Sequence, residues 1–160
     1  THDREEAFGL ADTLMLLHGG RIVQAGSTAE LFGQPANAWA AGFLGLGSLI
    51  SGVVLDAAPL RVGTALGNFI VSACARKWQP GQEVQLLLRP QDAQVLHKPP
   101  EGENQFTAQV LDCLFMGETY QSELRVGEYT LNIYTDTPIP VGTDVTVAFS
   151  PEKLSCLEAE

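Results

Sequence analysis

The first residues of the chain combine an imidazole with carboxylates at a point where a strand is expected to break into a helix. The opening run is Thr1-His2-Asp3-Arg4-Glu5-Glu6-Ala7. Asp3 can accept hydrogen bonds from the free N–H groups of a first helical turn, and Glu5 and Glu6 suit the positive end of the helix dipole. His2 would then lie just beyond the strand end. There an imidazole can donate one hydrogen bond to a phosphate while the protein holds its other nitrogen.

The phosphate-binding partners of such a histidine are missing from the sequence. A nucleotide-hydrolysing site needs a glycine-rich loop that ends in Gly-Lys-Ser/Thr and cradles the phosphates and magnesium. Here no lysine follows a glycine: Lys77, Lys98 and Lys153 follow Arg, His and Glu. The run 53–56 resembles the apolar residues and Asp of a metal-holding strand, but Ala57 stands where a catalytic Glu would be expected. We therefore expect an ordinary strand there and no complete enzyme in this chain.

Composition narrows the class of protein further. The 160 residues are 45% hydrophobic, enough for a packed core, and their formal net charge of −10 disfavours nucleic acid. No run of about 18 apolar residues is present, so we expect no membrane span. The three cysteines, Cys74, Cys113 and Cys156, lie far apart in the sequence, and we expect buried, reduced thiols. His18 and His97 have no partner at metal-ligand spacing, so we expect exposed loop or strand-end positions and no metal site.

The first 45 residues are expected to be helical with one β-hairpin. The expected elements are a helix over 3–12, strands over 14–17 and 21–24 joined by a two-residue turn, and helices over 29–32 and 35–44. Ser27 and Glu30 have the spacing of a capping box, Pro35 is expected to open the last helix, and Gly45 to end it. If this part is not held by a longer chain, we expect frayed or docked helices, with Leu14 and Leu16 exposed.

From about residue 46 onward the pattern changes to short alternating strands separated by Gly, Pro and Asn turns. Strands are expected over 49–55, 60–65, 69–73, 84–89, 93–96, 106–114, 119–126, 129–134, 145–149 and 154–157. Gly127 is expected to supply the positive φ of a type II′ turn. The run from Gly81 to Pro90 is matched by the run from Gly142 to Pro151, with apolar residues at the same places. This echo predicts a small closed or partly closed β-barrel from two related halves.

Residues 1–45 resemble the C-terminal end of the catalytic domain of ABC importer ATP-binding subunits, of the maltose, polyamine, sulfate or ferric-iron type. The residues that carry this resemblance are His2, Glu5-Glu6-Ala7, Ala11-Asp12, Gly20-Arg21-Ile22, Gly26-Ser27, Glu30-Leu31-Phe32, Pro35-Ala36-Asn37 and Phe43-Leu44-Gly45. In that family the histidine at the position of His2 touches the γ-phosphate and reports on hydrolysis. The resemblance implies that the chain begins inside a longer protein, in which His2 would play this role.

Residues 46–160 resemble the regulatory TOBE domain of the same subunits, an oligonucleotide-binding-type (OB-like) barrel. Leu88-Arg89-Pro90-Gln91-Asp92 is similar to its Arg-Pro-Glu signature, with Gln91 in place of the acid. The run from Phe115 to Tyr120 is similar to the ferric-iron branch. The expected fold is therefore mainly β, an OB-like barrel preceded by a helical and hairpin remnant. Arg89 is a candidate for a structural ion pair, or for a plain surface arginine.

The resemblance also implies the setting of the longer protein. It would bind ATP and magnesium, drive the permease subunits of an importer, and form a homodimer through its C-terminal barrel. It would lie in the cytoplasm at the inner face of the membrane, without inserting into it. This chain alone is expected to hold no cofactor and to be inactive.

Two other functions stay open from the sequence. One is a small-ligand or oxyanion-binding module, since related barrels bind molybdate-like anions, and the turns at Gly127 and Gly142 have free N–H groups to offer. The other is a nucleic-acid-binding barrel with Phe69, Trp78 and Tyr134 as stacking platforms. The acidic balance of the chain disfavours both.

Overall fold

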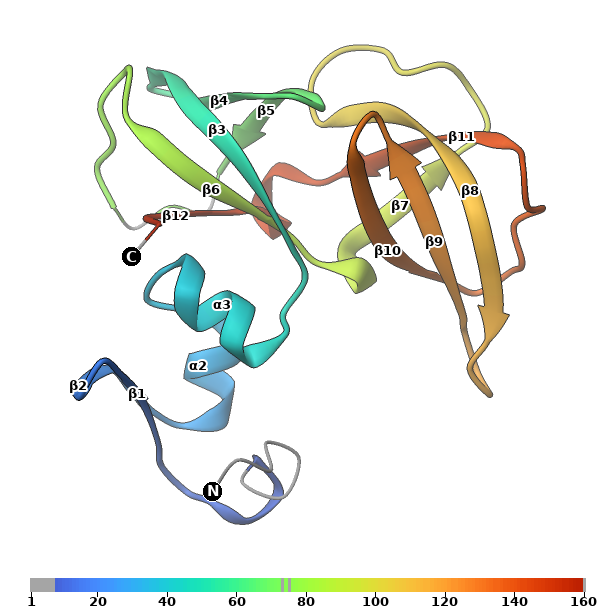
Figure 1. Ribbon diagram of the computed structural model, residues 1–160. Helices are drawn as coiled ribbons and strands as arrows, with labels where there is room; N and C mark the ends of the chain where they lie inside the picture. Colours follow the sequence, from blue (N-terminus) through green and yellow to red (C-terminus); the bar gives the residue numbers. More distant parts are fainter. Residues whose placement is uncertain (1–7, 73, 75, 160) are drawn as a thin grey trace.

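The molecule consists of a small N-terminal part of helices and one hairpin, followed by two curled β-sheets (Figure 1). The computed structural model describes residues 8–159 except Ala73 and Ala75. His2 therefore lies outside the described residues, as does most of the helix expected over 3–12. Residues 8–10 of that helix are helical, and the helix has ended by Ala11, so the expected end at residue 12 is wrong.

The N-terminal part follows its local capping signals. Strands β1 (Leu14–His18) and β2 (Arg21–Gly26) form an antiparallel hairpin, followed by helices α2 (Thr28–Gly33) and α3 (Ala38–Leu44). The capping box of Ser27 and Glu30 is present, and Gly45 ends α3 in the left-handed conformation at φ +68°. The expectation that Pro35 opens α3 is wrong. Asn37 is its N-cap, because its side chain accepts the Ala40 N–H at 2.9 Å.

Most of the chain forms two five-stranded antiparallel sheets, with each predicted strand present and its bounds within two residues of those expected. The first sheet has the order β12-β6-β3-β4-β5 and the second β10-β9-β8-β11-β7. Their strands are β3 (Ser48–Ala57), β4 (Leu60–Thr64), β5 (Gly67–Val71), β6 (Glu83–Leu88), β7 (Ala93–Leu96), β8 (Gln105–Phe115), β9 (Tyr120–Val126), β10 (Tyr129–Thr135), β11 (Asp144–Phe149) and β12 (Ser155–Leu157). The mainly β, OB-like fold class is thus confirmed.

The two sheets are repeats of one unit, as the echo in the sequence predicted. The short helical turns η1 (Pro90–Asp92) and η2 (Pro151–Lys153) occupy equivalent places, before β7 and β12. Gly81 and Gly142 have φ of +88° and +83°, and their N–H groups donate to the carbonyls of Val54 and Val110, each at 2.8 Å. The pairing of β3 with β4 and of β8 with β9 shifts directly after these same two valines.

The last strand of each repeat is exchanged. β7 follows the first repeat in sequence but pairs with β11 of the second, whereas β12 follows the second and pairs with β6 of the first. Each sheet curls so that its outer strand meets a helical turn: β5 contacts η2 and β10 contacts η1. This closure covers strand edges that would otherwise be open to pairing. Neither half of the barrel is therefore complete without the other.

Two hydrophobic clusters hold the molecule together. The larger lies between the β-sheets and includes Phe69, Phe106 and Phe149. The smaller joins α2, α3 and Leu16 to Leu87 of β6 and Leu157 of β12, which place their side chains on the outer face of the first sheet. The N-terminal part therefore packs on the barrel through apolar contacts.

The exposed apolar residues of the hairpin are not the ones expected. Leu16 is buried at 6% exposure and Leu14 is half-buried, whereas Met15 and Leu17 are 59% and 64% exposed. Alternation along β1 explains the difference, because successive side chains point to opposite faces of a strand and α2 and α3 cover the face of Leu16.

Candidate functional site at the junction with the barrel

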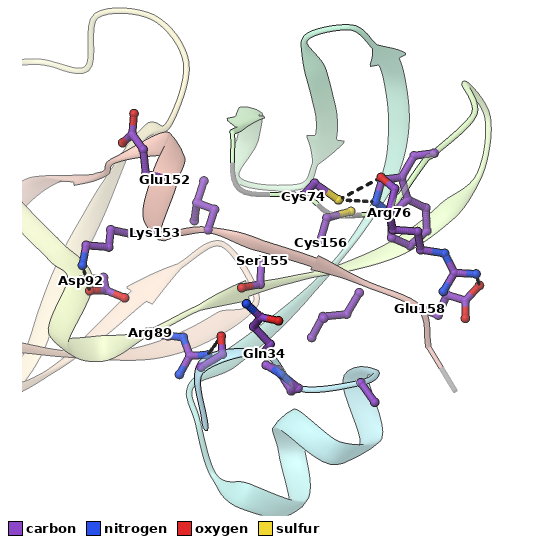
Figure 2. Close-up of a pocket in the computed structure, with 16 residues that line it drawn as sticks. Gln34, Cys74, Arg76, Arg89, Asp92, Glu152, Lys153, Ser155, Cys156 and Glu158 are labelled. Atoms are coloured by element: carbon purple, nitrogen blue, oxygen red, sulfur yellow. Dashed lines mark hydrogen bonds and ion pairs between the residues drawn. The ribbon is translucent and has the colours of Figure 1, made fainter. Parts of the chain in front are cut away.

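A cleft of about 700 Å³ opens where the N-terminal part meets the barrel (Figure 2). Its walls are the connection between α2 and α3, the strand β12 with η2 before it, and the chain that enters β6 around Trp78. A backbone hydrogen bond of 2.8 Å from the Ala38 N–H to the Glu158 carbonyl closes one end. The cleft thus lies at the contact between the two parts of the chain.

Arg89 joins the barrel to the end of helix α2. Its Nη2 donates to the carbonyl of Phe32 at 2.6 Å and to that of Gly33 at 3.5 Å. These are last-turn carbonyls, which lack partners within the helix and favour a nearby cation. Burial lowers the pKa of Arg89 from its usual value, and the charge of Asp92 acts in the opposite direction. Arg89 was expected to form a structural ion pair or to be a plain surface arginine. Its role is structural, but its hydrogen-bond partners are backbone carbonyls and not a carboxylate.

Four other charged groups of the cleft form two pairs of opposite charge. Arg76 forms an ion pair with Glu158, and its guanidinium lies over the Trp78 ring at 5.1 Å from the centroid. Lys153 Nζ lies 4.0 Å from an Asp92 carboxylate oxygen. With Glu152 and Arg89 the described lining has three acidic and three basic side chains. A site with so balanced a charge does not favour a strongly charged anion.

The described residues do not form a nucleotide or metal site. Among them no group of three or more His, Cys, Asp or Glu side chains is placed to hold a metal ion. They also contain no Gly-Lys phosphate loop, so they do not fit ATP and magnesium. Residues 53–56 lie in β3, as expected of an ordinary strand. His97 is exposed, and His18 ends β1, where its ring stacks on Trp39 at a centroid distance of 4.2 Å.

The expected stacking platforms for nucleic acid are not brought together on the surface. Phe69 is fully buried and Trp78 is 7% exposed, so only Tyr134 of the three presents a ring to solvent. The hairpin turn at Gly127 is present, with φ +58° and Val126 paired with Tyr129.

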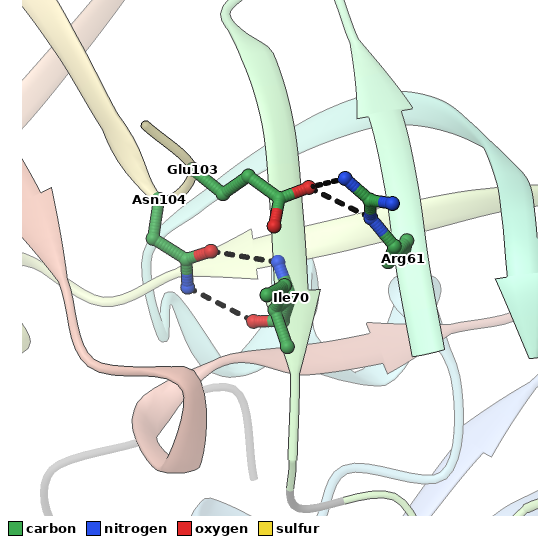
Figure 3. A network of polar contacts seen from close by, with 4 residues as sticks. All are labelled: Arg61, Ile70, Glu103 and Asn104. Atoms are coloured by element: carbon green, nitrogen blue, oxygen red, sulfur yellow. Dashed lines mark hydrogen bonds and ion pairs between the residues drawn. The ribbon is translucent and has the colours of Figure 1, made fainter. Parts of the chain in front are cut away.

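Asn104, which the sequence pattern does not single out, links the two sheets (Figure 3). Its side-chain oxygen accepts the Ile70 N–H at 2.6 Å, and its side-chain nitrogen donates to the Ile70 carbonyl at 2.9 Å. The ion pair of Arg61 and Glu103 lies beside it. The one local signal is that Asn tolerates a left-handed backbone, and Asn104 has φ +60°.

Comparison with known proteins identifies the barrel. Residues 86–157 match the family model described as the TOBE domain. The chain carries a TOBE domain. Over its whole length it is similar to the C-terminal region of ABC importer ATP-binding subunits, which confirms the resemblance seen in the sequence. The TOBE match covers the second repeat together with the end of β6 and all of β7 from the first.

Curated relatives of the chain include spermidine/putrescine import ATP-binding proteins. Identity is 26% over 158 residues with that of Aster yellows witches'-broom phytoplasma, covering 99% of this chain and 36% of the relative. It is 26% over 161 residues for Clostridioides difficile, covering 100% and 44%, and 32% over 130 residues for Oleidesulfovibrio alaskensis, covering 79% and 35%. The chain thus spans less than half the length of these curated relatives.

A solved structure shares the fold of the TOBE-containing part. The cytoplasmic molybdate-binding protein ModG superposes with a TM-score of 0.56 at 12% identity, over 69% of this chain and 95% of ModG. At this identity the likeness concerns the fold alone.

Proposed function

We propose that this chain is the regulatory and dimerisation region of the ATP-binding subunit of a polyamine importer. Residues 1–45 would be the end of the catalytic domain and residues 46–160 the regulatory domain. The observation that carries the proposal is that almost the whole chain aligns with a spermidine/putrescine import subunit, at 26% identity over 158 residues, and that residues 86–157 match the TOBE domain. Short linear polyamines replace the ferric-iron cargo expected from Phe115–Tyr120, because the relatives reported above are polyamine importers and lend the iron branch no support.

The regulatory domain would act by keeping two copies together. A permanent contact at the barrel holds the catalytic domains at a high effective concentration between cycles, and a two-fold contact uses the same patch on both copies. The candidate patch is the apolar end of β8, where Leu114, Phe115 and Met116 are 54%, 63% and 60% exposed. An exposed apolar patch of this kind is typical of a protein–protein contact.

In the longer protein, ATP and magnesium would bind outside the residues described above. His2 would face the γ-phosphate from a neighbouring position, and the subunit would work on permease partners at the cytoplasmic face of the membrane. No described helix is long and apolar enough to cross a bilayer. The junction cleft would carry movement between the two domains, since Arg89 and the Ala38–Glu158 hydrogen bond connect them.

The test is the solution mass of the chain over a range of concentrations, by sedimentation equilibrium. We expect a monomer–dimer equilibrium that F115E shifts at least tenfold toward monomer. V141E is the control, because Val141 is also 60% exposed and apolar but lies in the loop before β11, outside the candidate patch. A chain that stays monomeric at high concentration would overturn the dimerisation role. If F115E and V141E weaken dimerisation equally, the dimer contact is not at the end of β8.

The alternative function is a small-ligand or oxyanion-binding module. The shared fold with a molybdate-binding protein is the observation in its favour. The balanced charges of the junction cleft oppose it. Titration calorimetry with molybdate and with sulfate separates the two functions, because the regulatory role predicts no heat of binding.

A further inference from the structure

Two cysteines that lie 82 positions apart in the sequence meet at the junction cleft. Cys74 and Cys156 both line it, and their sulfur atoms are drawn next to each other in Figure 2. Cys74 also packs against the large hydrophobic cluster that contains Cys156. The third cysteine, Cys113, lies on β8 outside the lining of this cleft. The fold thus sorts three thiols into a neighbouring pair and a separate one.

The two thiols of the pair differ in access and in surroundings. Cys74 is half-buried, and its sulfur accepts the indole N–H of Trp78 at 2.9 Å while its S–H points to the Arg76 carbonyl at 3.3 Å. Cys156 is only 7% exposed. Burial, with a smaller contribution from Cys74, raises the pKa of Cys156 to about 12. The more exposed Cys74 is therefore the thiol whose sulfur can reach an oxidant from solvent first, and the buried Cys156 would react after it.

We propose that Cys74 and Cys156 are a redox-active pair that forms a disulfide when the protein meets a hydroperoxide. Cys74 sulfur would attack the peroxide, breaking the O–O bond and giving a sulfenic acid and one water from hydrogen peroxide. Cys156 sulfur would then attack the Cys74 sulfur, breaking its S–O bond and releasing a second water. In total the peroxide accepts two electrons and two protons from the thiols. A small thiol reverses the change by disulfide exchange.

The new bond would act on the contact between the two parts of the chain. It would fix the strand that contains Cys156 to the connection around Cys74. Two residues further on, Glu158 accepts the Ala38 N–H and pairs with Arg76. Oxidation would therefore stiffen the end of β12, against which the start of α3 rests.

The test is mild oxidation of the folded chain with hydrogen peroxide, followed by denaturation, thiol titration and intact mass. We expect the three free thiols to fall to one, the mass of the monomer to fall by about 2 Da, and a digest without reductant to contain a peptide pair joined through Cys74 and Cys156. The C113S variant is the matched control, and should lose both of its thiols and the same mass. C74S should retain both remaining thiols at the same peroxide dose.

Several outcomes would overturn the proposal. Addition of one or more oxygens to Cys74 without loss of the Cys156 thiol would mean that the two sulfurs do not meet. The proposal would also be overturned if the only disulfides were between two chains through Cys113. It would be overturned as well if all three thiols stayed unchanged after peroxide treatment. Circular dichroism of the oxidised and reduced samples checks that the chain stays folded during the treatment. A Cys74–Cys156 disulfide that forms only in unfolded chains would also contradict the proposal.

Discussion

Asn104 pairs through its side chain with both backbone groups of Ile70, in the way that one strand residue pairs with another. The two hydrogen bonds are 2.6 Å and 2.9 Å long, and Asn104 is 6% exposed. Its own backbone takes part as well, because its N–H donates to the Asn68 carbonyl and its carbonyl accepts the Phe149 N–H, each at 3.0 Å. One residue thereby connects β5 of the first sheet to the start of β8 and the end of β11 in the second.

Replacing Asn104 should loosen both sheets at once. N104A leaves the Ile70 N–H and C=O without partners, at about 1–3 kcal/mol each, and places a Cβ residue at positive φ at a further cost of about 1 kcal/mol. We expect a loss of about 3–5 kcal/mol in the free energy of unfolding, measured with urea. N104G should lose about 1 kcal/mol less, since glycine adopts this φ freely.

N132A is the matched control for these variants. Asn132 is exposed on β10 and its side chain accepts one hydrogen bond, of 3.3 Å, from Gln121. We expect a change within about 0.5 kcal/mol. A similar small change for N104A would show that the Ile70 groups find other partners.

Arg89 should hold helix α2 on the barrel. R89M keeps much of the apolar stem but leaves the Phe32 carbonyl without its charged donor, a bond worth about 1.5–3 kcal/mol. We expect amide hydrogen exchange in residues 28–33 to speed up by about tenfold or more, while exchange in β9 and β10 stays unchanged. R125M is the control, because Arg125 is exposed and its hydrogen bond to Gln109 stays within the second sheet. Equal acceleration by both variants would contradict a specific role for Arg89.

The sequence predicted those structural features that are set by residues a few positions apart in the chain. Alternation placed every strand, the glycines at 81 and 142 marked equivalent turns, and Ser27 with Glu30 marked a helix start, because each of these signals acts over a few residues. The start of α3 was missed, because Pro35 and Asn37 are both common near helix starts and only the side-chain hydrogen bond to Ala40 decides between them.

Contacts between distant residues could not be predicted in this way. Nothing in the two related runs shows that β7 and β12 are exchanged between repeats, since both partners offer an equivalent strand edge. The meeting of Cys74 with Cys156 follows from that exchange, because β12 lies beside β6. The partners of Asn104 and Arg89 are backbone groups, which leave no trace in the residue types of the sequence. The junction cleft could therefore be recognised only in the folded structure, although the TOBE domain that forms one side of it was expected from the sequence.

Helix α2 should lose its cap in acid. Hydrogen bonds from the Ser27 backbone and side chain lower the pKa of the Glu30 carboxyl. A carboxyl with a lowered pKa in the folded state stabilises that state above its ordinary pKa, and this contribution is lost as the pH falls through the lowered value. We expect the Ser27 amide proton to shift in NMR spectra below about pH 4.5, the usual pKa of the group. E30Q should remove this titration, whereas E118Q, at an exposed loop position, should leave it intact.

Gly47 is where the N-terminal part turns into the barrel, and it should tolerate no side chain. Its φ is +157°, and a Cβ there would overlap the Leu88 carbonyl oxygen and come within 3.0 Å of Arg89 Cα. Both obstacles are backbone atoms at the end of the neighbouring strand β6 and directly after it, so relief requires moving this segment away from β3. We expect G47A to destabilise the chain by about 3 kcal/mol or more. G127A is the control: Gly127 has φ +58° but open space around a Cβ, so only the backbone cost of about 1 kcal/mol applies. If the two variants unfold at the same urea concentration, the close approach of Gly47 to β6 is not a constraint on the fold.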